Sequence, residues 1–202
     1  FLLVLWGVAV ACSRREARFR IGVSQCSEDE WRRQMNSENS VKPFYEDVEV
    51  DIRTAVDDND RQAKDIRELI AEGVDLLIVA PNEATPITPV VEEAYNRGIP
   101  VIVVDRKIFG QNTAYVGADN YEIGKAVGEY VANVLHGQGD VVEISGLVGS
   151  TPAVDRHQGF VKAISAYPGI RLLAVEDGAW LQLKAEEKDT LLSRFPHIDL
   201  VY

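Results

Sequence analysis

Short apolar runs alternate with amphipathic stretches along most of the chain. Apolar residues that recur at helical spacing, as in Ala63, Ile66, Leu69 and Ile70, predict helices between these runs. Strands that alternate with helices and short turns are typical of a parallel α/β sheet. We therefore predict an α/β fold from residue 19 onward, with strands at 20–24, 47–54, 74–80, 99–104, 114–118, 141–145, 170–175 and 198–202.

Glycines and short polar residues mark the ends of the predicted helices. Asn59 or Asp60 can cap the helix that begins there, and Gly73 suits its C-terminal end. Gly98 ends the next helix in the same way. Further helices are predicted to begin near 28–31, to cover 121–135, to follow the turn at Gly146–Thr151 and carry Phe160, Val161 and Ile164, and to follow Trp180.

Polar residues stand at the carboxyl ends of several predicted strands, where ligands bind in open α/β sheets. Asp105-Arg106 follows the run 99–104, Asn82 follows 74–80, and Ser24-Gln25 ends the first strand. A carboxylate beside a guanidinium accepts from, and donates to, the neighbouring hydroxyls of a sugar. The alternative is a structural salt bridge that caps the strand. A second pair, Asp155-Arg156, favours ligand binding.

Two tryptophans add aromatic surface to this picture. Trp31-Arg32 falls in the helix expected after the first strand, and Trp180 follows the turn at Asp177-Gly178. A tryptophan face packs well against the C–H side of a sugar ring. Each could instead be an anchor of the core.

Composition and motif spacing argue against several other functions. The net charge of −11 among 202 residues disfavours nucleic acid and anionic membranes as partners. Three histidines and two cysteines show no zinc or metalloprotease spacing, so we predict no metal and no cofactor. The turn from Gly146 to Thr151 lacks the lysine of a P-loop. Ser150, Asp155 and His157 are too close along one helix to suggest a catalytic triad, so we predict a protein without enzyme activity.

The first eleven residues are apolar apart from Gly7, and Cys12-Ser13-Arg14-Arg15 follows. This stretch is too short to span a bilayer but suits a secretory signal. Small residues before Cys12 resemble a lipoprotein processing site, so we predict an export segment at 1–12, lipidation of Cys12 and a linker at 13–18. An ordinary signal peptide or signal anchor is the alternative. Without an initiator Met, and with its end inside a predicted strand, the chain is expected to be truncated at both ends. Cys26 is expected to be a buried small residue.

Several stretches together resemble the type I periplasmic sugar-binding proteins, of the ribose- and galactofuranose-binding kind. They are Ile21–Gln25, Gly73–Pro81, Gly98–Arg106, Ala118–Asn120 and Glu143–Phe160. The resemblance implies two Rossmann-like parallel-sheet domains that close on a sugar, a first lobe at 19–118 and an incomplete second lobe at 119–202.

The resemblance also implies roles for individual residues. Asp105 and Arg106 would bind sugar hydroxyls from the first lobe, and Arg156 from the second. Ser24-Gln25 and Trp31-Arg32 would line the cleft. Ribose binders carry phenylalanines in the first loop, where this chain has Ser27-Glu28-Asp29-Glu30, and this difference argues against ribose.

The predicted function is capture of a monosaccharide-like ligand by an exported, periplasmic protein, with a transporter permease as partner. The stretch Ser24–Arg32 is also similar to sensing domains of Bacteroidetes hybrid two-component receptors, whose partner is a kinase module. A sugar-acting hydrolase is a third hypothesis. A lac-repressor-like regulator would need a helix-turn-helix before residue 19, where the apolar segment stands instead.

Overall fold

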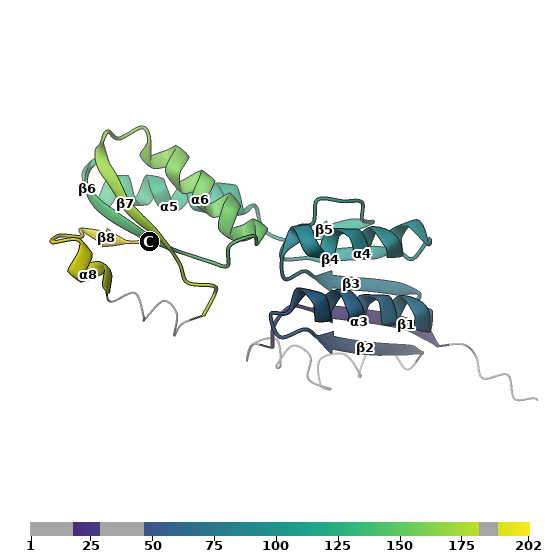
Figure 1. Cartoon of the computed structure of the whole chain (residues 1–202). Coiled ribbons are helices and arrows are strands. Elements are labelled where there is room, and N and C mark those ends of the chain that lie inside the picture. Colours follow the sequence, from purple (N-terminus) through teal and green to yellow (C-terminus); the bar gives the residue numbers. More distant parts are fainter. Residues whose placement is uncertain (1–17, 29–46, 182–189) are drawn as a thin grey trace, which may run out of the picture.

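Two parallel sheets, each with helices packed along it, form two lobes that are joined through residues 117–119 (Figure 1). The computed structural model describes residues 18–28, 47–181 and 190–202. The predicted α/β class with two parallel-sheet lobes is confirmed. No helix within these described ranges is long and apolar enough to cross a bilayer. The predicted export segment with Cys12, and the predicted linker apart from Arg18, lie outside them.

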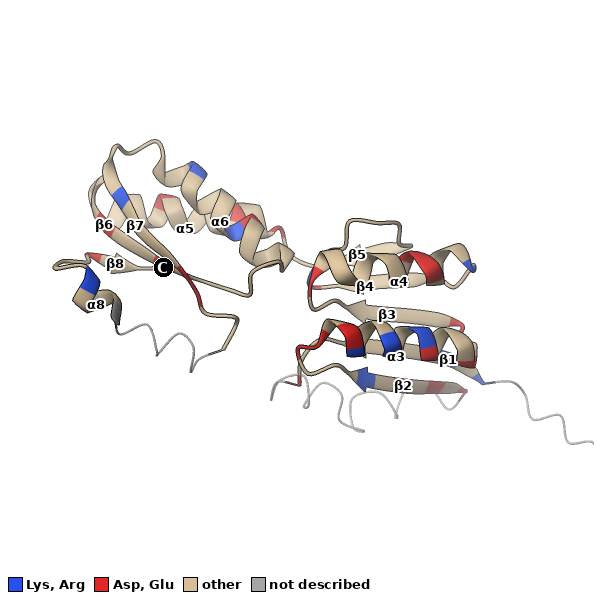
Figure 2. Ribbon diagram, viewed as in Figure 1, with Lys and Arg blue, Asp and Glu red and all other residues tan. Residues whose placement is uncertain are grey.

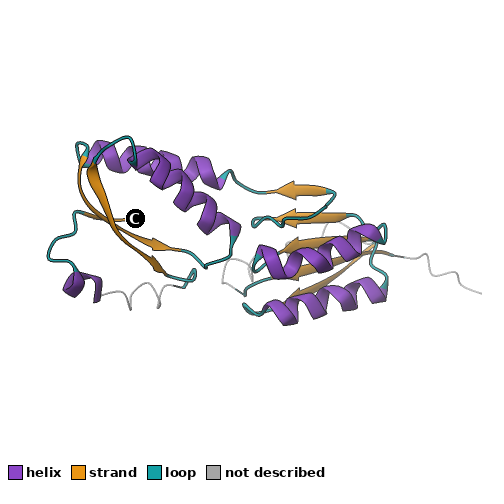
Figure 3. Cartoon of the chain, turned by 45° about the horizontal axis from the view of Figure 1, so that its top comes forward, coloured by secondary structure: helices purple, strands orange, loops and turns teal. Residues whose placement is uncertain are grey.

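The first lobe is a five-stranded sheet in the order β2-β1-β3-β4-β5, and every neighbouring pair is parallel. Helices α3 and α4 cover one face of the sheet (Figure 3). Their buried side chains, Ile66, Leu69, Ile87 and Val90 among them, pack against the strands. The elements are β1 (Phe19–Gln25), β2 (Val48–Thr54), α3 (Asn59–Glu72), β3 (Leu76–Ala80), α4 (Ala84–Asn96), β4 (Val101–Val104) and β5 (Ala114–Val116).

The N-terminal cap of α3 is Asp58, so the predicted cap at Asn59 or Asp60 is wrong. The Asp58 carboxylate accepts a hydrogen bond from the Arg61 backbone N–H at 3.0 Å. Asn59 is the first helical residue, and its side chain instead donates to Glu83 at 2.6 Å. A capping residue must lie just outside the helix, where its backbone is extended, and Asp58 has this conformation.

Gly73 and Gly98 end α3 and α4 with left-handed backbones, at φ 75° and 81°. The next residue then bonds back to the helix: Val74 N donates to Leu69 O, and Ile99 N donates to Ala94 O. The N–H groups of Val74 and Ile99 are therefore bonded to the preceding helices and do not bond to a neighbouring strand. The predicted strands at 74–80 and 99–104 therefore begin two residues later than expected, at Leu76 and Val101.

Exposed faces of the helices in the first lobe carry both signs of charge (Figure 2). Along α3, Arg61 pairs with Asp65 and Lys64 with Glu68, each four residues apart. Arg53 on the edge strand β2 contacts Glu68 at 2.7 Å. The acidic excess is thus interspersed with basic groups on this lobe.

The second lobe has a three-stranded parallel sheet in the order β7-β6-β8. Its core joins Phe160 of α6 to the central strand, and the Phe160 ring stacks on Tyr202 at 4.4 Å between centroids. Within the run predicted as a strand at 198–202, the strand itself covers Leu200–Val201, and Asp199 and Tyr202 on either side also form backbone hydrogen bonds to the central strand. The elements are α5 (Asn120–Val134), β6 (Gln138–Ser145), α6 (Thr151–Ile164), β7 (Gly169–Asp177), α8 (Thr190–Arg194) and β8 (Leu200–Val201).

Helices α5 and α6 touch backbone to backbone through glycines (Figure 3). A Cβ at Gly124 would overlap the carbonyl group of Arg156, and one at Gly159 would overlap the carbonyl oxygen of Tyr121. Only glycine permits so close an approach. The packing fixes the backbone of Arg156 against α5.

Gly124→Ala should lower the free energy of unfolding by about 1–3 kcal/mol, because the added methyl group must push the two helices apart. An alanine in an unconstrained helix would have the opposite effect. Urea unfolding measures the change, with the exposed Ala126→Ser on the same helix as a control that should stay within about 0.5 kcal/mol. A more stable Gly124→Ala protein would contradict the close packing.

Candidate ligand-binding site

Asp105 and Arg106 lie directly beyond β4, at the carboxyl edge of the first sheet. Arg106 is only 7% exposed, and its Nη1 donates to the Asn82 backbone oxygen at 2.6 Å and to Asn82 Oδ1 at 3.3 Å. Asp105 has a left-handed backbone at φ 66°, and its carbonyl oxygen accepts from the Tyr115 hydroxyl at 2.7 Å. A non-glycine residue persists in that region only where its surroundings hold it. The chain thus turns sharply here, with the guanidinium inside and Asp105 exposed.

The Asn82 residue that binds Arg106 is itself held by a buried hydrogen-bond network centred on the side chain of Gln62 in α3. This side chain is fully buried. Its Nε2 donates to Ala80 O at 2.9 Å and to Ser24 Oγ at 3.3 Å, while its Oε1 accepts from Asn82 N at 2.8 Å. The amide therefore ties the ends of β1 and β3 together and fixes the residue that holds Arg106.

The network shows where several of the predicted ligand residues lie. Ser24 and Asn82 are buried and bonded within the lobe, and Asn82 Nδ2 donates to Asn59 Oδ1 and Asp57 O. Gln25, the last residue of β1, is partly exposed. Trp31 and Arg32 lie outside the described residues. Cys26 is fully buried, as predicted.

Gln62→Leu should destabilise the chain by about 2–4 kcal/mol, because it leaves the Ala80 carbonyl and the Asn82 N–H buried without their partner. Chemical denaturation measures the loss. The same substitution at the exposed Gln111 is the control and should have little effect. Equal stability of the Gln62 variant and the parent would show that the network does not hold the strand ends.

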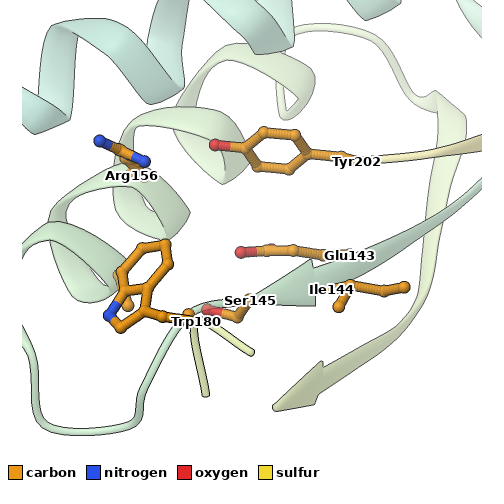
Figure 4. A pocket seen from close by; sticks show the side chains of 8 residues that line it. Glu143, Ile144, Ser145, Arg156, Trp180 and Tyr202 are labelled. Carbon is orange, nitrogen blue, oxygen red and sulfur yellow. The ribbon is translucent and has the colours of Figure 1, made fainter. Parts of the chain in front are cut away.

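The second lobe carries a small pocket of about 90 Å³ at the carboxyl end of β6 (Figure 4). The side chains of Glu143 and Tyr202 point across it toward Arg156 and Trp180 (Figure 4). Two of these four, Arg156 and Trp180, were predicted as ligand residues. The pocket is lined by Glu143, Ile144, Ser145, Gly146, Ala153, Arg156, Trp180 and Tyr202.

Arg156 is held from two sides within this pocket. Its Nε donates to Asn120 Oδ1 at 2.9 Å, and its guanidinium carbon lies 5.6 Å from the centroid of the Trp180 ring. The second distance is typical of a cation–π contact. Arginine and tryptophan side by side offer hydrogen-bond donors and a flat apolar face to one ligand.

Glu143 was not predicted, although it is the one charged residue in the run Val141–Ser145. It is 2% exposed, and its Oε2 lies 2.7 Å from His157 Nδ1. Burial raises the pKa of the neighbouring Tyr202 hydroxyl, and the Glu143 charge raises it further. A lone acidic residue inside an apolar strand was the signal available in the sequence.

The side chains considered for a hydrolase are each engaged elsewhere. The Ser150 hydroxyl donates to Leu147 O at 2.8 Å, Asp155 binds Lys107, and His157 binds Glu143. These contacts point the three groups to different partners. They do not form a relay of nucleophile, base and orienting acid.

Trp180 owes its position to an unusual backbone. Ala179 and Trp180 both have left-handed conformations, at φ 50° and 60°, and the Ala179 N–H donates to the Asp177 carboxylate at 2.7 Å. The indole lies over Gly146 and donates from Nε1 to Ser150 Oγ at 3.2 Å. Trp180 as a whole residue remains 42% exposed, and it lines the pocket.

Gly146→Ala should displace the Trp180 ring, because the added Cβ would overlap the indole. We expect a shift in tryptophan emission, with little change in unfolding free energy because the ring is half exposed. The Trp180→Phe protein identifies the contribution of this ring, and Val148→Ala in the same turn is the control. An unchanged spectrum in Gly146→Ala would show that the indole does not rest on Gly146.

The two lobes meet beside these residues. The Lys107 backbone N–H donates to Thr151 Oγ1 at 2.8 Å, and Lys107 Nζ lies 3.0 Å from Asp155 Oδ2. The hydrogen bond to Asp155 raises the pKa of the Lys107 ammonium. Lys107 follows Arg106, and Asp155 precedes Arg156, so the junction joins the two segments that carry the arginines.

Comparison with known proteins agrees with this architecture. The model of the periplasmic binding protein domain family matches residues 23–202. The fructose-binding periplasmic domain of a hybrid two-component system is 57% identical, with a TM-score of 0.87 over 92% of this chain and 63% of that one. The galactofuranose-binding protein YtfQ of Escherichia coli is 31% identical over 92% of this chain and 61% of its own length.

A further solved structure, a Mycobacterium smegmatis protein in complex with β-D-fucofuranose, is 30% identical. Its TM-score is 0.79, over 91% of this chain and 63% of that one. The chain thus spans less than two thirds of the length of these relatives. It belongs to the periplasmic binding protein domain family.

Proposed function

We propose that this periplasmic binding protein domain captures a monosaccharide in its furanose form, with fructose as the first candidate. The observation that carries the proposal is the pocket that joins Arg156 to Trp180 in a chain 57% identical to a fructose-binding domain. Two other relatives bind galactofuranose and fucofuranose, which share the five-membered ring.

In this proposal the sugar lies between the carboxyl edges of the two sheets. Asp105 accepts from sugar hydroxyls, and Arg106 and Arg156 donate to them from opposite lobes. Trp180 packs against the C–H face of the ring. The lobes close on the ligand about the segment at 117–119, as two-domain binding proteins do.

The proposed role of capture is sensing rather than uptake. The relative with 57% identity is the periplasmic domain of a hybrid two-component system, whereas the galactofuranose-binding protein is 31% identical. The partner would then be a kinase module, and the alternative partner is a transporter permease. Sequencing the gene downstream of codon 202 decides between them: kinase motifs support sensing, and a stop codon without them supports uptake.

The proposed protein is periplasmic, held to the membrane by lipid on Cys12, and it performs no reaction on its sugar. The relatives compared above are named for sugar binding. Incubation of the protein with a panel of glycosides should release no product. Mass spectrometry of the protein isolated from the membrane should find a lipid group on Cys12.

Arg156→Ala should weaken fructose binding by about 2–4 kcal/mol, because a charge-assisted hydrogen-bond donor is lost inside a closed site. Asp105→Asn should weaken it in the same direction. Isothermal titration of the full-length protein measures both, with the exposed Arg97→Ala, directly after α4, as the matched control. Melting temperatures check that each variant is folded.

Two outcomes would contradict the proposal. Arg156→Ala with the parent's affinity would remove this residue from the site. If the folded parent shows no heat with fructose, galactofuranose or other furanoses at millimolar concentration, the proposed class of ligand is wrong.

A further inference from the structure

Asn120 is a buried polar residue to which neither the sequence nor the proposed function assigned a role. It is 3% exposed and is the first residue of α5, directly after the segment that joins the two lobes. Its carboxamide is used at both ends. Oδ1 accepts from Arg156 Nε at 2.9 Å, and Nδ2 donates to the Ala118 backbone oxygen at 3.3 Å.

The bond to Nε determines how Arg156 presents its other donors. A guanidinium is planar, so once the Nε–H direction is fixed the two Nη groups can move only by rotation of the plane about that bond. The Trp180 ring, 5.6 Å from the guanidinium carbon, restricts the same group from another side. With Nε bound to Asn120, the two Nη groups are left to face the pocket, which Arg156 lines.

The backbone of Arg156 is fixed by the same helix. Gly124 lies four residues after Asn120, one turn along α5, and packs directly on the Arg156 carbonyl group. One face of α5 therefore contacts both parts of Arg156: Gly124 contacts its main chain, and Asn120 bonds its side chain. That face begins at the joining segment, through the bond from Asn120 to Ala118.

We propose that Asn120 is a positioning residue for ligand binding: it selects the orientation of Arg156 and ties it to the backbone at the lobe junction. The inference rests on the proposed function, since it assumes that Arg156 binds the sugar. Asn120 itself does not contact the ligand. It restricts the orientation of the Arg156 side chain before the sugar binds, so the arginine loses less conformational entropy on binding.

A double-mutant cycle with fructose tests the inference in the full-length protein. Asn120→Ala should weaken binding about tenfold, the usual scale for one lost charge-assisted bond. In the Arg156→Ala background the same change should have no further effect, because the group that Asn120 positions is gone. Asn120→Asp keeps the acceptor for Nε and should restore affinity to within about threefold of the parent. Titrations extended to millimolar sugar keep the weakest variants measurable.

Emission of Trp180 gives a readout that needs no sugar. Asn120→Ala should alter it, because the guanidinium beside the ring is released, and Asn120→Asp should leave it unchanged. The exposed Asn133→Ala on the same helix is the matched control for affinity and emission.

The outcomes separate this inference from the proposed function. An equal loss from Asn120→Ala with and without Arg156, or an Asn120→Asp protein as weak as Asn120→Ala, would show a general structural role and overturn the inference alone. Arg156→Ala with full affinity would overturn both. If Asn120→Ala does not fold, Asn120→Asp and its cycle with Arg156→Ala decide: loss of binding in this folded variant overturns the inference.

Discussion

Each lobe holds one arginine through the side chain of a buried asparagine. Asn82 accepts from Arg106 in the first lobe, and Asn120 accepts from Arg156 in the second. Arg106 is buried, and its guanidinium would cost several kcal/mol without such a partner. In these bonds the acceptors are the neutral carbonyl and amide oxygens of the two asparagines. Other contacts within each lobe position the Asn82 and Asn120 side chains.

Different parts of the fold accomplish this in the two lobes. In the first lobe Gln62 reaches from α3 to the ends of β1 and β3, so the helix locks the sheet edge that carries Asn82. In the second lobe the glycines at 124 and 159 let α5 and α6 approach until their backbones touch. One lobe therefore depends on a polar network and the other on close backbone packing.

Local features of the chain could be predicted from its sequence, and contacts between distant residues could not. The apolar runs predicted the strands, since a buried strand must exclude polar groups, and their alternation with helices predicted that the strands are parallel. The starts of β3 and β4 were misplaced because the bonds that follow Gly73 and Gly98 return to the helices. Gln62 and Asn120 are ordinary polar residues in the sequence. Their importance comes from partners 18 to 38 positions away, which only the folded chain brings near.

The structure places the predicted ligand residues in different surroundings. Arg156 and Trp180 line one pocket, while Ser24 and Asn82 are buried beneath the surface they were expected to form. Side chains at the end of a strand alternate in direction, so some polar groups point toward the surface and others toward the interior of the lobe. Exposure differs even within the pair Asp105-Arg106: Asp105 is exposed, whereas Arg106 is 7% exposed and bound to Asn82.

The contact between the lobes at Lys107 is made half by side chain and half by backbone. Mutational drift at position 107 can remove the ammonium group, yet every amino acid except proline still supplies the N–H that donates to Thr151. The hydroxyl at 151 has fewer substitutes, since serine supplies the same acceptor but a valine of the same shape as threonine accepts nothing. Robustness to mutation is therefore unequally divided across the junction. This bond leaves position 107 in the first lobe free to vary, whereas it constrains position 151 in the second lobe.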